Sequence, residues 1–320
     1  MKTNSILIIV FSIIFFSACI KEKAVDANFI EVQLPTDLTI NQILQQNDST
    51  LWVAAGNRFG AGSVLRSTDY GENWIKVLDA VQDVRSIRLL NSRIYALPIG
   101  NTFFWSDNNG QSWQSLLMPG WEFFSAATFL NDYSGILVGG ENFGKGIVHT
   151  VYTGANSNLL SVDTIQHELT DIITLNDSSI IAVGYGVILR SEDKGISWIP
   201  DKTRGDFFKA VDFPDSMTGY VAGDYGSLHK TTDGGKSWKK IKNSSTFFNK
   251  NNRFNDISFI NNKTGALVGK NGLVWYTNNG GDTWIPIHNI PKTDFKSVFV
   301  NNLHIIVGTE NGKLLFIDKP

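Results

Sequence analysis

The sequence predicts an all-β protein, a seven-bladed β-propeller closed by an N-terminal strand that completes the last blade. Two observations carry this prediction. A turn motif recurs five times, and similar apolar segments recur between its copies at intervals near 40 residues. A period of this length with several short strands per unit is typical of a propeller rather than of helical repeats. No long segment shows convincing helical periodicity.

The recurring motif is Ser/Thr-x-Asp/Asn-x-Gly-x-x-Trp. Its Asp or Asn can accept hydrogen bonds from the backbone N–H groups that follow, and its glycine tolerates the positive φ of a tight turn. We expect its tryptophan to open the next strand and to be buried. We interpret these residues as structural, and the five copies contain Asp69, Gly71 and Trp74; Asn108, Gly110 and Trp113; Asp193, Gly195 and Trp198; Asp233, Gly235 and Trp238; and Asn279, Gly281 and Trp284.

The motif resembles the Asp-box of the bacterial neuraminidase repeat, and the spacing around it resembles propellers of the photosystem II stability/assembly factor family. The resemblance covers nearly all of the chain after its N-terminal segment. It implies that the boxes are scaffold turns rather than active sites, and that the protein assists the assembly or stability of a membrane-associated complex. Nothing in the sequence points to a photosystem as that complex.

Successive boxes are 39, 85, 40 and 46 residues apart, counted between their Asp or Asn residues. The 85-residue interval must hold two units, of which one has lost its box. Each unit predicts four strands, and the seven first strands are expected near Ile40, Val84, Phe124, Leu169, Phe208, Phe254 and Phe295. The last unit ends before a fourth strand, so we expect residues 28–33 to pair beside residues 314–317 and remove the exposed edge. Six or eight blades are the alternatives.

The N-terminal segment predicts export and lipid attachment. An apolar run over residues 6–16 is too short for a typical spanning helix. Small residues precede Cys19, the only cysteine, in a pattern that resembles the lipobox of bacterial lipoproteins. We expect residues 1–18 to be a signal peptide, residues 19–27 a tether from the lipid-modified Cys19, and residues 28–320 one propeller domain. The protein would then lie on the periplasmic face or the cell surface. An uncleaved anchor or a plain signal is the alternative.

Composition argues against several kinds of site. The formal net charge is −2, so no basic surface for nucleic acid is indicated. The five histidines show no metal-ligand spacing, and one cysteine allows neither a Cys-based metal site nor an intramolecular disulfide. We therefore expect no metal and no cofactor. The glycine-rich turns recur as strand connectors, which is unlike a phosphate-binding loop.

The enzymatic alternative is a sialidase-like or other glycoside hydrolase acting on extracytoplasmic glycans. The Arg-Ile-Pro motif of sialidases is absent. Xyloglucan-cleaving enzymes with Asp-boxes use paired carboxylates between two propellers, whereas this chain predicts one propeller. No nucleophile and base can be paired from the sequence. The sequence therefore favours a non-catalytic module that binds a protein or a membrane-associated complex. A glycan is the other candidate partner.

The partner site is expected where loops converge on one propeller face. Aromatic and basic side chains are typical anchors of interfaces, and the candidates are Arg58, Arg85, Trp121, Arg204, Lys209, Phe247, Phe248, Arg253 and Lys296.

The second residue of each first strand is polar, and three of the seven are cationic. These residues are Asn41, Arg85, Ser125, Thr170, Lys209, Asn255 and Lys296. Because first strands line the channel of a propeller, they predict a positive ring at its mouth that attracts an acidic peptide segment. The alternative is that these positions are polar only because they are solvated.

Overall fold

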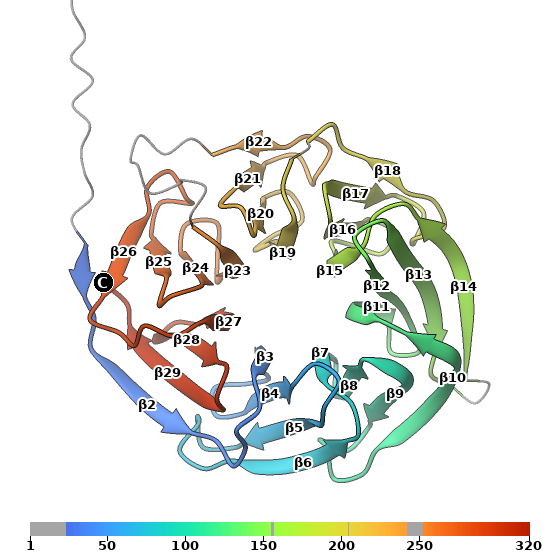
Figure 1. Cartoon of the computed structure of the whole chain (residues 1–320), viewed down its shortest axis with the longest axis horizontal. Helices are drawn as coiled ribbons and strands as arrows, with labels where there is room; N and C mark the ends of the chain where they lie inside the picture. The colour runs from blue at the N-terminus through green and yellow to red at the C-terminus, as the bar shows by residue number, and fades with distance from the viewer. Residues whose placement is uncertain (1–23, 155–156, 204, 242–251) are drawn as a thin grey trace, which may run out of the picture.

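The computed structural model describes residues 24–154, 157–203, 205–241 and 252–320. Within them the protein is an all-β ring of seven sheets around a central channel (Figure 1). The predicted seven-bladed propeller is therefore confirmed. The described residues include no helix long and apolar enough to cross a membrane. The predicted signal peptide and Cys19 lie outside the described residues.

Each blade presents its four strands from the channel outward. The first strands are β3 (Ile40–Gln45), β7 (Val84–Leu90), β11 (Phe124–Asn131), β15 (Leu169–Thr174), β19 (Phe208–Asp212), β23 (Phe254–Phe259) and β27 (Phe295–Val300). The second strands are β4 (Leu51–Gly56), β8 (Arg93–Pro98), β12 (Ser134–Glu141), β16 (Ile180–Gly184), β20 (Gly219–Gly223), β24 (Gly265–Gly269) and β28 (His304–Thr309).

The two outer strands complete each sheet. The third strands are β5 (Gly62–Ser67), β9 (Gly100–Ser106), β13 (Lys145–Tyr152), β17 (Val187–Ser191), β21 (Leu228–Thr231), β25 (Val274–Thr277) and β29 (Lys313–Asp318). The fourth strands are β6 (Ile75–Ala80), β10 (Gln114–Glu122), β14 (Asn158–Ile165), β18 (Ile199–Pro200), β22 (Lys239–Lys240), β26 (Ile285–His288) and, from the N-terminus, β2 (Phe29–Gln33).

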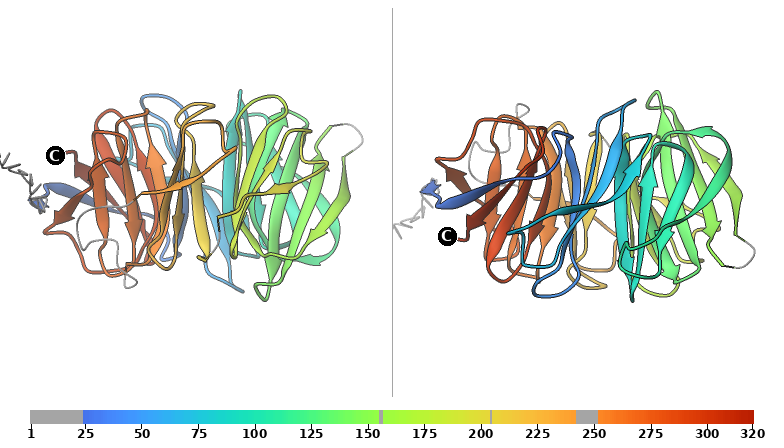
Figure 2. Two further views of the ribbon diagram at one scale, coloured as in Figure 1. Left: turned by 90° about the horizontal axis from the view of Figure 1, so that it is seen from above. Right: turned by 90° about the horizontal axis from the view of Figure 1, so that it is seen from below.

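The core lies between neighbouring blades. Second strands such as β4 and β16 are buried at every residue, because each sheet packs face to face against a sheet on either side. Their sequences are accordingly apolar runs without alternation. Figure 2 shows these sheets standing side by side around the ring axis. Each first strand begins with one of the seven predicted apolar residues, all of them buried.

The ring closes through the N-terminal strand, as the sequence predicts. β2 pairs antiparallel with β29, with Phe29 opposite Ile317 and Gln33 opposite Lys313. One further pairing was not predicted. β1 (Val25–Asp26) adds in parallel to the outer edge of β26 in blade 6. The folded domain therefore begins at Val25 rather than at residue 28, and the N-terminal segment joins two neighbouring blades.

The Asp-boxes close turns between the third and fourth strands. In blade 5 the hydroxyl of Thr231 donates to Asp233 Oδ1 over 2.7 Å and accepts from Gly235 N over 3.1 Å. Asp233 Oδ1 also accepts from Ser237 N over 3.0 Å. The same contacts act electrostatically in blade 1, where hydrogen bonds from Asn73 lower the pKa of Asp69 to about 2.

The boxes also hold adjacent blades together. A Cβ atom added at Gly235, where φ is +78°, would lie 2.5 Å from Ile181 Cδ1 in the preceding blade. Arg190 of that blade donates from Nε to the carbonyl oxygen of Gly234 over 3.0 Å. The glycine thus serves both the turn and a close contact between blades.

The box tryptophans differ from expectation in two respects. The outer strand begins one residue later, as at Lys239 in β22. Trp284 is buried, whereas the other four are half-buried. These four side chains are half-buried because they lie next to the outer strands, where one side of each indole faces solvent.

Candidate binding site at the channel mouth

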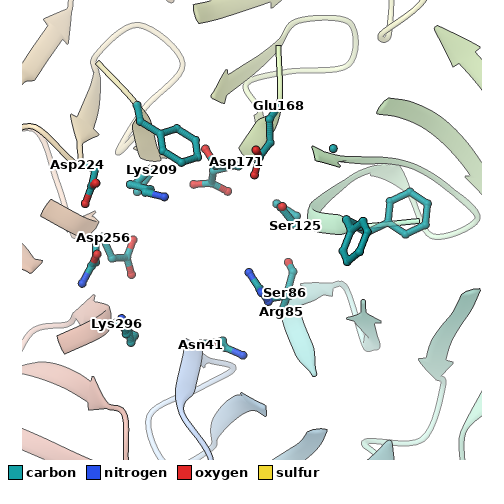
Figure 3. Close-up of a pocket in the computed structure, with 18 of the residues that line it drawn as sticks. Asn41, Arg85, Ser86, Ser125, Glu168, Asp171, Lys209, Asp224, Asp256 and Lys296 are labelled. Carbon is teal, nitrogen blue, oxygen red and sulfur yellow. The ribbon is translucent and has the colours of Figure 1, made fainter. Parts of the chain in front are cut away.

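A cavity of about 670 Å³ occupies one mouth of the central channel. Figure 3 shows polar side chains from different blades converging on it. All seven second residues of the first strands line this cavity. The alignment of repeats therefore placed these seven residues at one site.

A β-bulge explains why these residues share one orientation. In every blade the register between first and second strands shifts after the first residue, for example between Phe208 and Ala210 in blade 5. The same shift recurs at the start of β3, β7, β11, β15, β23 and β27. A bulge leaves one residue outside the ladder and re-aims its side chain. The second residue of each first strand therefore faces the mouth, and we call these seven second residues the bulge residues.

Three of the seven bulge residues hold neighbouring blades together. Asn41 Nδ2 donates to the carbonyl oxygen of Val84 over 2.9 Å, and Asn255 Nδ2 donates to that of Phe295 over 2.7 Å. Thr170 Oγ1, in blade 4, donates to the carbonyl oxygen of Phe208 in blade 5 over 2.7 Å. These three polar residues hold the scaffold together, and the remaining four are Ser125 and the cations Arg85, Lys209 and Lys296, of which only the cations bring a charge to a ligand.

The predicted positive ring is wrong as a uniform feature. Arg85 Nε lies 2.5 Å from Asp83 Oδ2, and Lys296 Nζ lies 2.8 Å from Glu310 Oε1. Six basic and five acidic side chains line the cavity, so its charge is nearly balanced. The acids that pair with Arg85 and Lys296 lie at positions that the alignment of second residues does not include. Asp83 precedes the first strand β7, and Glu310 lies in the turn between β28 and β29.

Other predicted residues fall in different places. Arg58 and Arg253 line the cavity, and Arg253 binds Asp224 through both nitrogens of its fork. Trp121 is 51% exposed but does not line the cavity; its ring covers Gly100. Arg204, Phe247 and Phe248 lie outside the described residues.

An aromatic cluster on the mouth was missed by the sequence reasoning. Phe143, Tyr185 and Phe207 come from three loops, and their ring centroids are 4.9 to 5.7 Å apart. We call these three residues the aromatic wall. Phe143 and Tyr185 lie in connections from second to third strands, between β12 and β13 and between β16 and β17. Neither residue belongs to the repeat pattern. An aromatic residue in a loop outside that pattern is the signal by which the sequence could have indicated them.

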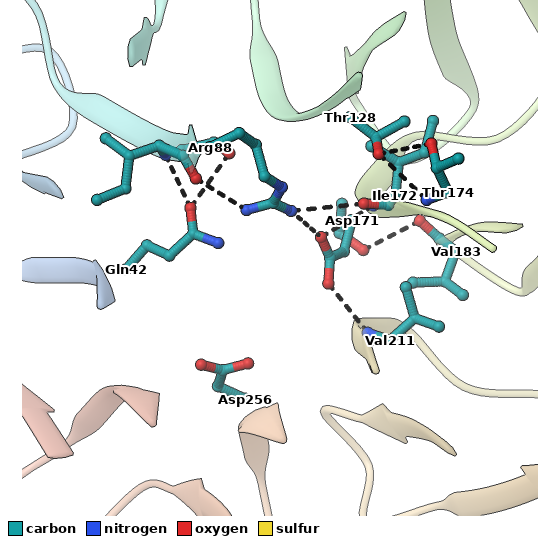
Figure 4. A network of polar contacts seen from close by, with 12 residues as sticks. Gln42, Arg88, Thr128, Asp171, Ile172, Thr174, Val183, Val211 and Asp256 are labelled. Carbon is teal, nitrogen blue, oxygen red and sulfur yellow. Dashed lines mark hydrogen bonds and ion pairs between the residues drawn. The ribbon is translucent and has the colours of Figure 1, made fainter. Parts of the chain in front are cut away.

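Asp171, Asp212 and Asp256 lie on the first strands β15, β19 and β23, and Figure 4 shows Asp171 and Asp256 at the channel. Asp171 Oδ2 accepts from Val211 N over 3.0 Å, Asp212 Oδ2 from Phe259 N over 2.6 Å, and Asp256 Oδ2 from Val298 N over 2.8 Å. Each carboxylate thus satisfies a backbone N–H at the inner edge of the next blade. Arg88 Nη2 lies 3.4 Å from Asp171 Oδ1.

Desolvation raises the pKa of all three carboxyl groups: to about 7 for Asp212, well above its usual value for Asp256, and upward for Asp171. Asp171 keeps 20% of its side-chain surface accessible because it faces the channel, yet the surrounding protein still removes most of its hydration. Among the described residues no cluster of His, Cys, Asp and Glu is placed to hold a metal ion.

The fold resembles those of known proteins. Residues 204–304 match the family model of the photosynthesis system II assembly factor YCF48. The resemblance predicted from the sequence is therefore confirmed. No curated protein sequence matches the chain.

Solved YCF48 structures share the whole propeller. YCF48 bound to a D1 peptide superposes with a TM-score of 0.73 at 17% identity, covering 93% of this chain and 98% of that one. YCF48 from Cyanidioschyzon merolae gives 0.70 at 16% identity, covering 91% and 98%. At such identities the likeness shows the fold.

The same fold also serves an enzyme. Selenomethionine-substituted virginiamycin B lyase from Staphylococcus aureus superposes with a TM-score of 0.74 at 10% identity, covering 92% of this chain and 100% of that one. The architecture shared with YCF48 therefore does not by itself separate binding from catalysis, because function depends on the residues of the site.

Proposed function

We propose that the protein is a lipid-anchored, non-catalytic module that takes up a segment of a partner protein at the channel mouth. In this role it assists the assembly or stability of a membrane-associated complex outside the cytoplasm. The observation that carries the proposal is the mouth itself, where a cavity of about 670 Å³ is lined by the seven aligned bulge residues and by Phe143 and Phe207 of the aromatic wall. A cavity with aromatic surface and a few placed charges is typical of a ligand site.

The comparisons support a protein segment as the ligand. YCF48 has been solved with a D1 peptide, and it shares this propeller. An extended segment suits a mouth whose aromatic and charged side chains come from loops of several blades. Such a segment can place alternate side chains against the wall and into the channel.

Site-specific photo-crosslinking in cells tests where the partner binds. Tyr225 lines the cavity and is 56% exposed, whereas Ile199 lies on β18 at the outer rim and is 61% exposed. We expect p-benzoylphenylalanine at position 225 to give a discrete crosslinked product and the same residue at position 199 to give none. Equal crosslinking at both positions, or none at 225, would contradict a partner site at the mouth.

The lipid anchor is tested at Cys19. Because it is the only cysteine, thioether attachment of lipid can occur at no other residue. Cys19→Ser protein should take up no fatty-acid analogue in metabolic labelling and should leave the membrane fraction. The Ser17→Ala variant, which keeps a small residue before the cysteine, serves as the control and should label normally. Labelling of Cys19→Ser at the wild-type level would show that the lipoprotein interpretation is wrong.

A further inference from the structure

Lys209 differs from the other two cationic bulge residues at the mouth. Arg85 and Lys296 have carboxylate partners at 2.5 and 2.8 Å. Among the described residues the ammonium group of Lys209 forms no ion pair, and it lies 3.5 Å from the centroid of the Phe207 ring. Its charge is therefore held by an aromatic face rather than by a carboxylate.

The carboxylates that raise the pKa of Lys209 are engaged elsewhere. Asp224 and Glu168 both act on the Lys209 charge from nearby. Asp224 is bound by the guanidinium fork of Arg253, and Glu168 Oε2 accepts from Phe143 N over 3.0 Å. Figure 3 shows Lys209 between Asp224 and Asp171 at the opening, and Asp171 pairs with Arg88. An incoming anion would thus find a cation that no ion pair occupies.

Lys209 is also partly desolvated. Burial lowers its pKa from the usual value, and this outweighs the nearby acids that raise it. A partly desolvated ammonium has lost some of its hydration without gaining a carboxylate in return. A ligand anion that approaches within hydrogen-bond distance would restore that lost stabilisation, so binding there is favoured over binding to a solvated surface lysine.

The surroundings restrict the kind of anion. Phe207, under the ammonium, belongs to the aromatic wall, whose Phe143 and Tyr185 are 52% and 41% exposed. Five acidic side chains nearly balance the six basic ones in the cavity lining, and Arg85, Lys296 and Arg253 are paired with acids. Within the described residues Lys209 therefore offers one cation without an ion pair to a single negative charge, rather than a cluster of cations to a dianion. The matching ligand carries one carboxylate beside an aromatic or aliphatic group.

We propose that Lys209 and the aromatic wall form the specificity site of the mouth, which binds a single peptide carboxylate flanked by an apolar side chain. This inference rests on the proposed function, in which the mouth takes up a protein segment. An acidic residue of that segment contacts Lys209, and its apolar neighbour packs against the aromatic wall.

Calorimetric titration with short synthetic peptides tests this assignment. The probe is N-acetyl-Phe-Glu-Phe-amide, and N-acetyl-Phe-Gln-Phe-amide is its uncharged match. N-acetyl-Phe-Phe with a free C-terminus separates a terminal from a side-chain carboxylate, and inorganic phosphate tests a simple anion site. We expect wild-type protein to bind at least one carboxylate peptide at least tenfold more tightly than the Gln peptide and more tightly than phosphate.

Matched variants identify the residue responsible. Lys209→Gln should weaken the carboxylate peptide at least tenfold and leave the Gln peptide nearly unchanged, and Lys209→Arg should recover part of the loss. Lys296→Gln removes the same charge from the equivalent bulge position, where Glu310 already neutralises it. It should therefore cost much less, about two- to threefold. Circular dichroism melts establish that each variant is folded.

Three outcomes would overturn the assignment. These are equal losses in Lys209→Gln and Lys296→Gln, equal binding of the Glu and Gln peptides, and phosphate binding more tightly than any peptide. If photo-crosslinking at position 225 still gives a product, the mouth remains the partner site and only the role of Lys209 fails. If that product is absent as well, the proposed function fails with it.

Discussion

Removal of residues 25–33 should cost the propeller about 5 kcal/mol, a large share of the 5–15 kcal/mol typical of a folded domain. The deletion removes β1 and β2, and with them the outer strand of blade 7. Phe29 packs on the core between blades 6 and 7, and Val32 packs on the core between blades 7 and 1. Two partly buried apolar side chains contribute roughly 2 kcal/mol, and the ladder of hydrogen bonds to β29 contributes a similar amount or more.

Denaturant unfolding of two truncated proteins measures this effect. A protein that begins at residue 34 should unfold at much lower denaturant than one that begins at residue 24, which keeps both strands. If the shorter protein does not fold, single substitutions address the same point. Phe29→Ala should cost about 1–2 kcal/mol because Phe29 is partly buried, and Ile30→Ala should cost under about 0.5 kcal/mol because Ile30 is 66% exposed. Similar midpoints for the two truncated proteins would show that β2 does not close the ring.

Asp212→Asn should stabilise the protein at pH 8 by roughly 2–4 kcal/mol and leave its stability nearly unchanged near pH 4. Burial raises the pKa of Asp212 from 3.8 to about 7 in the folded protein. A raised carboxyl pKa contributes stability that is fully present below pH 3.8 and is lost as the pH rises through about 7. At pH 8 the wild-type protein therefore carries a desolvated charge that the amide lacks, while the amide oxygen still accepts from Phe259 N.

The neighbouring carboxyl group provides the control. Asp171→Asn should bring no comparable gain at pH 8, because it removes the carboxylate that pairs with Arg88 and leaves the guanidinium without it. Chemical denaturation of the two variants and the wild type at pH 4, 6 and 8 makes the comparison. A constant difference between Asp212→Asn and the wild type across this range would mean that Asp212 does not titrate as its surroundings indicate.

The alignment of repeats predicts which residues meet at the mouth but not how their charges are paired. Aligning first strands brought Arg85, Lys209 and Lys296 to one site because the same bulge recurs in every blade. The alignment could not show that Glu310 neutralises Lys296, because that acid comes from the turn between β28 and β29. Nor could it show that Arg88 meets Asp171, 83 positions away in sequence.

The sequence by itself determined the number of blades, the first residue of each inner strand and the strand that closes the ring. These follow from local physics: buried strands need apolar residues, tight turns need glycine and a capping side chain, and an open edge needs a partner. Only the tertiary structure decided that β1 joins blade 6, that most box tryptophans stay half-buried, and that Lys209 alone among the bulge cations lacks a carboxylate partner within the described residues. These depend on which distant segments the closed ring brings together, because charge compensation and desolvation are set by neighbours in space rather than along the chain.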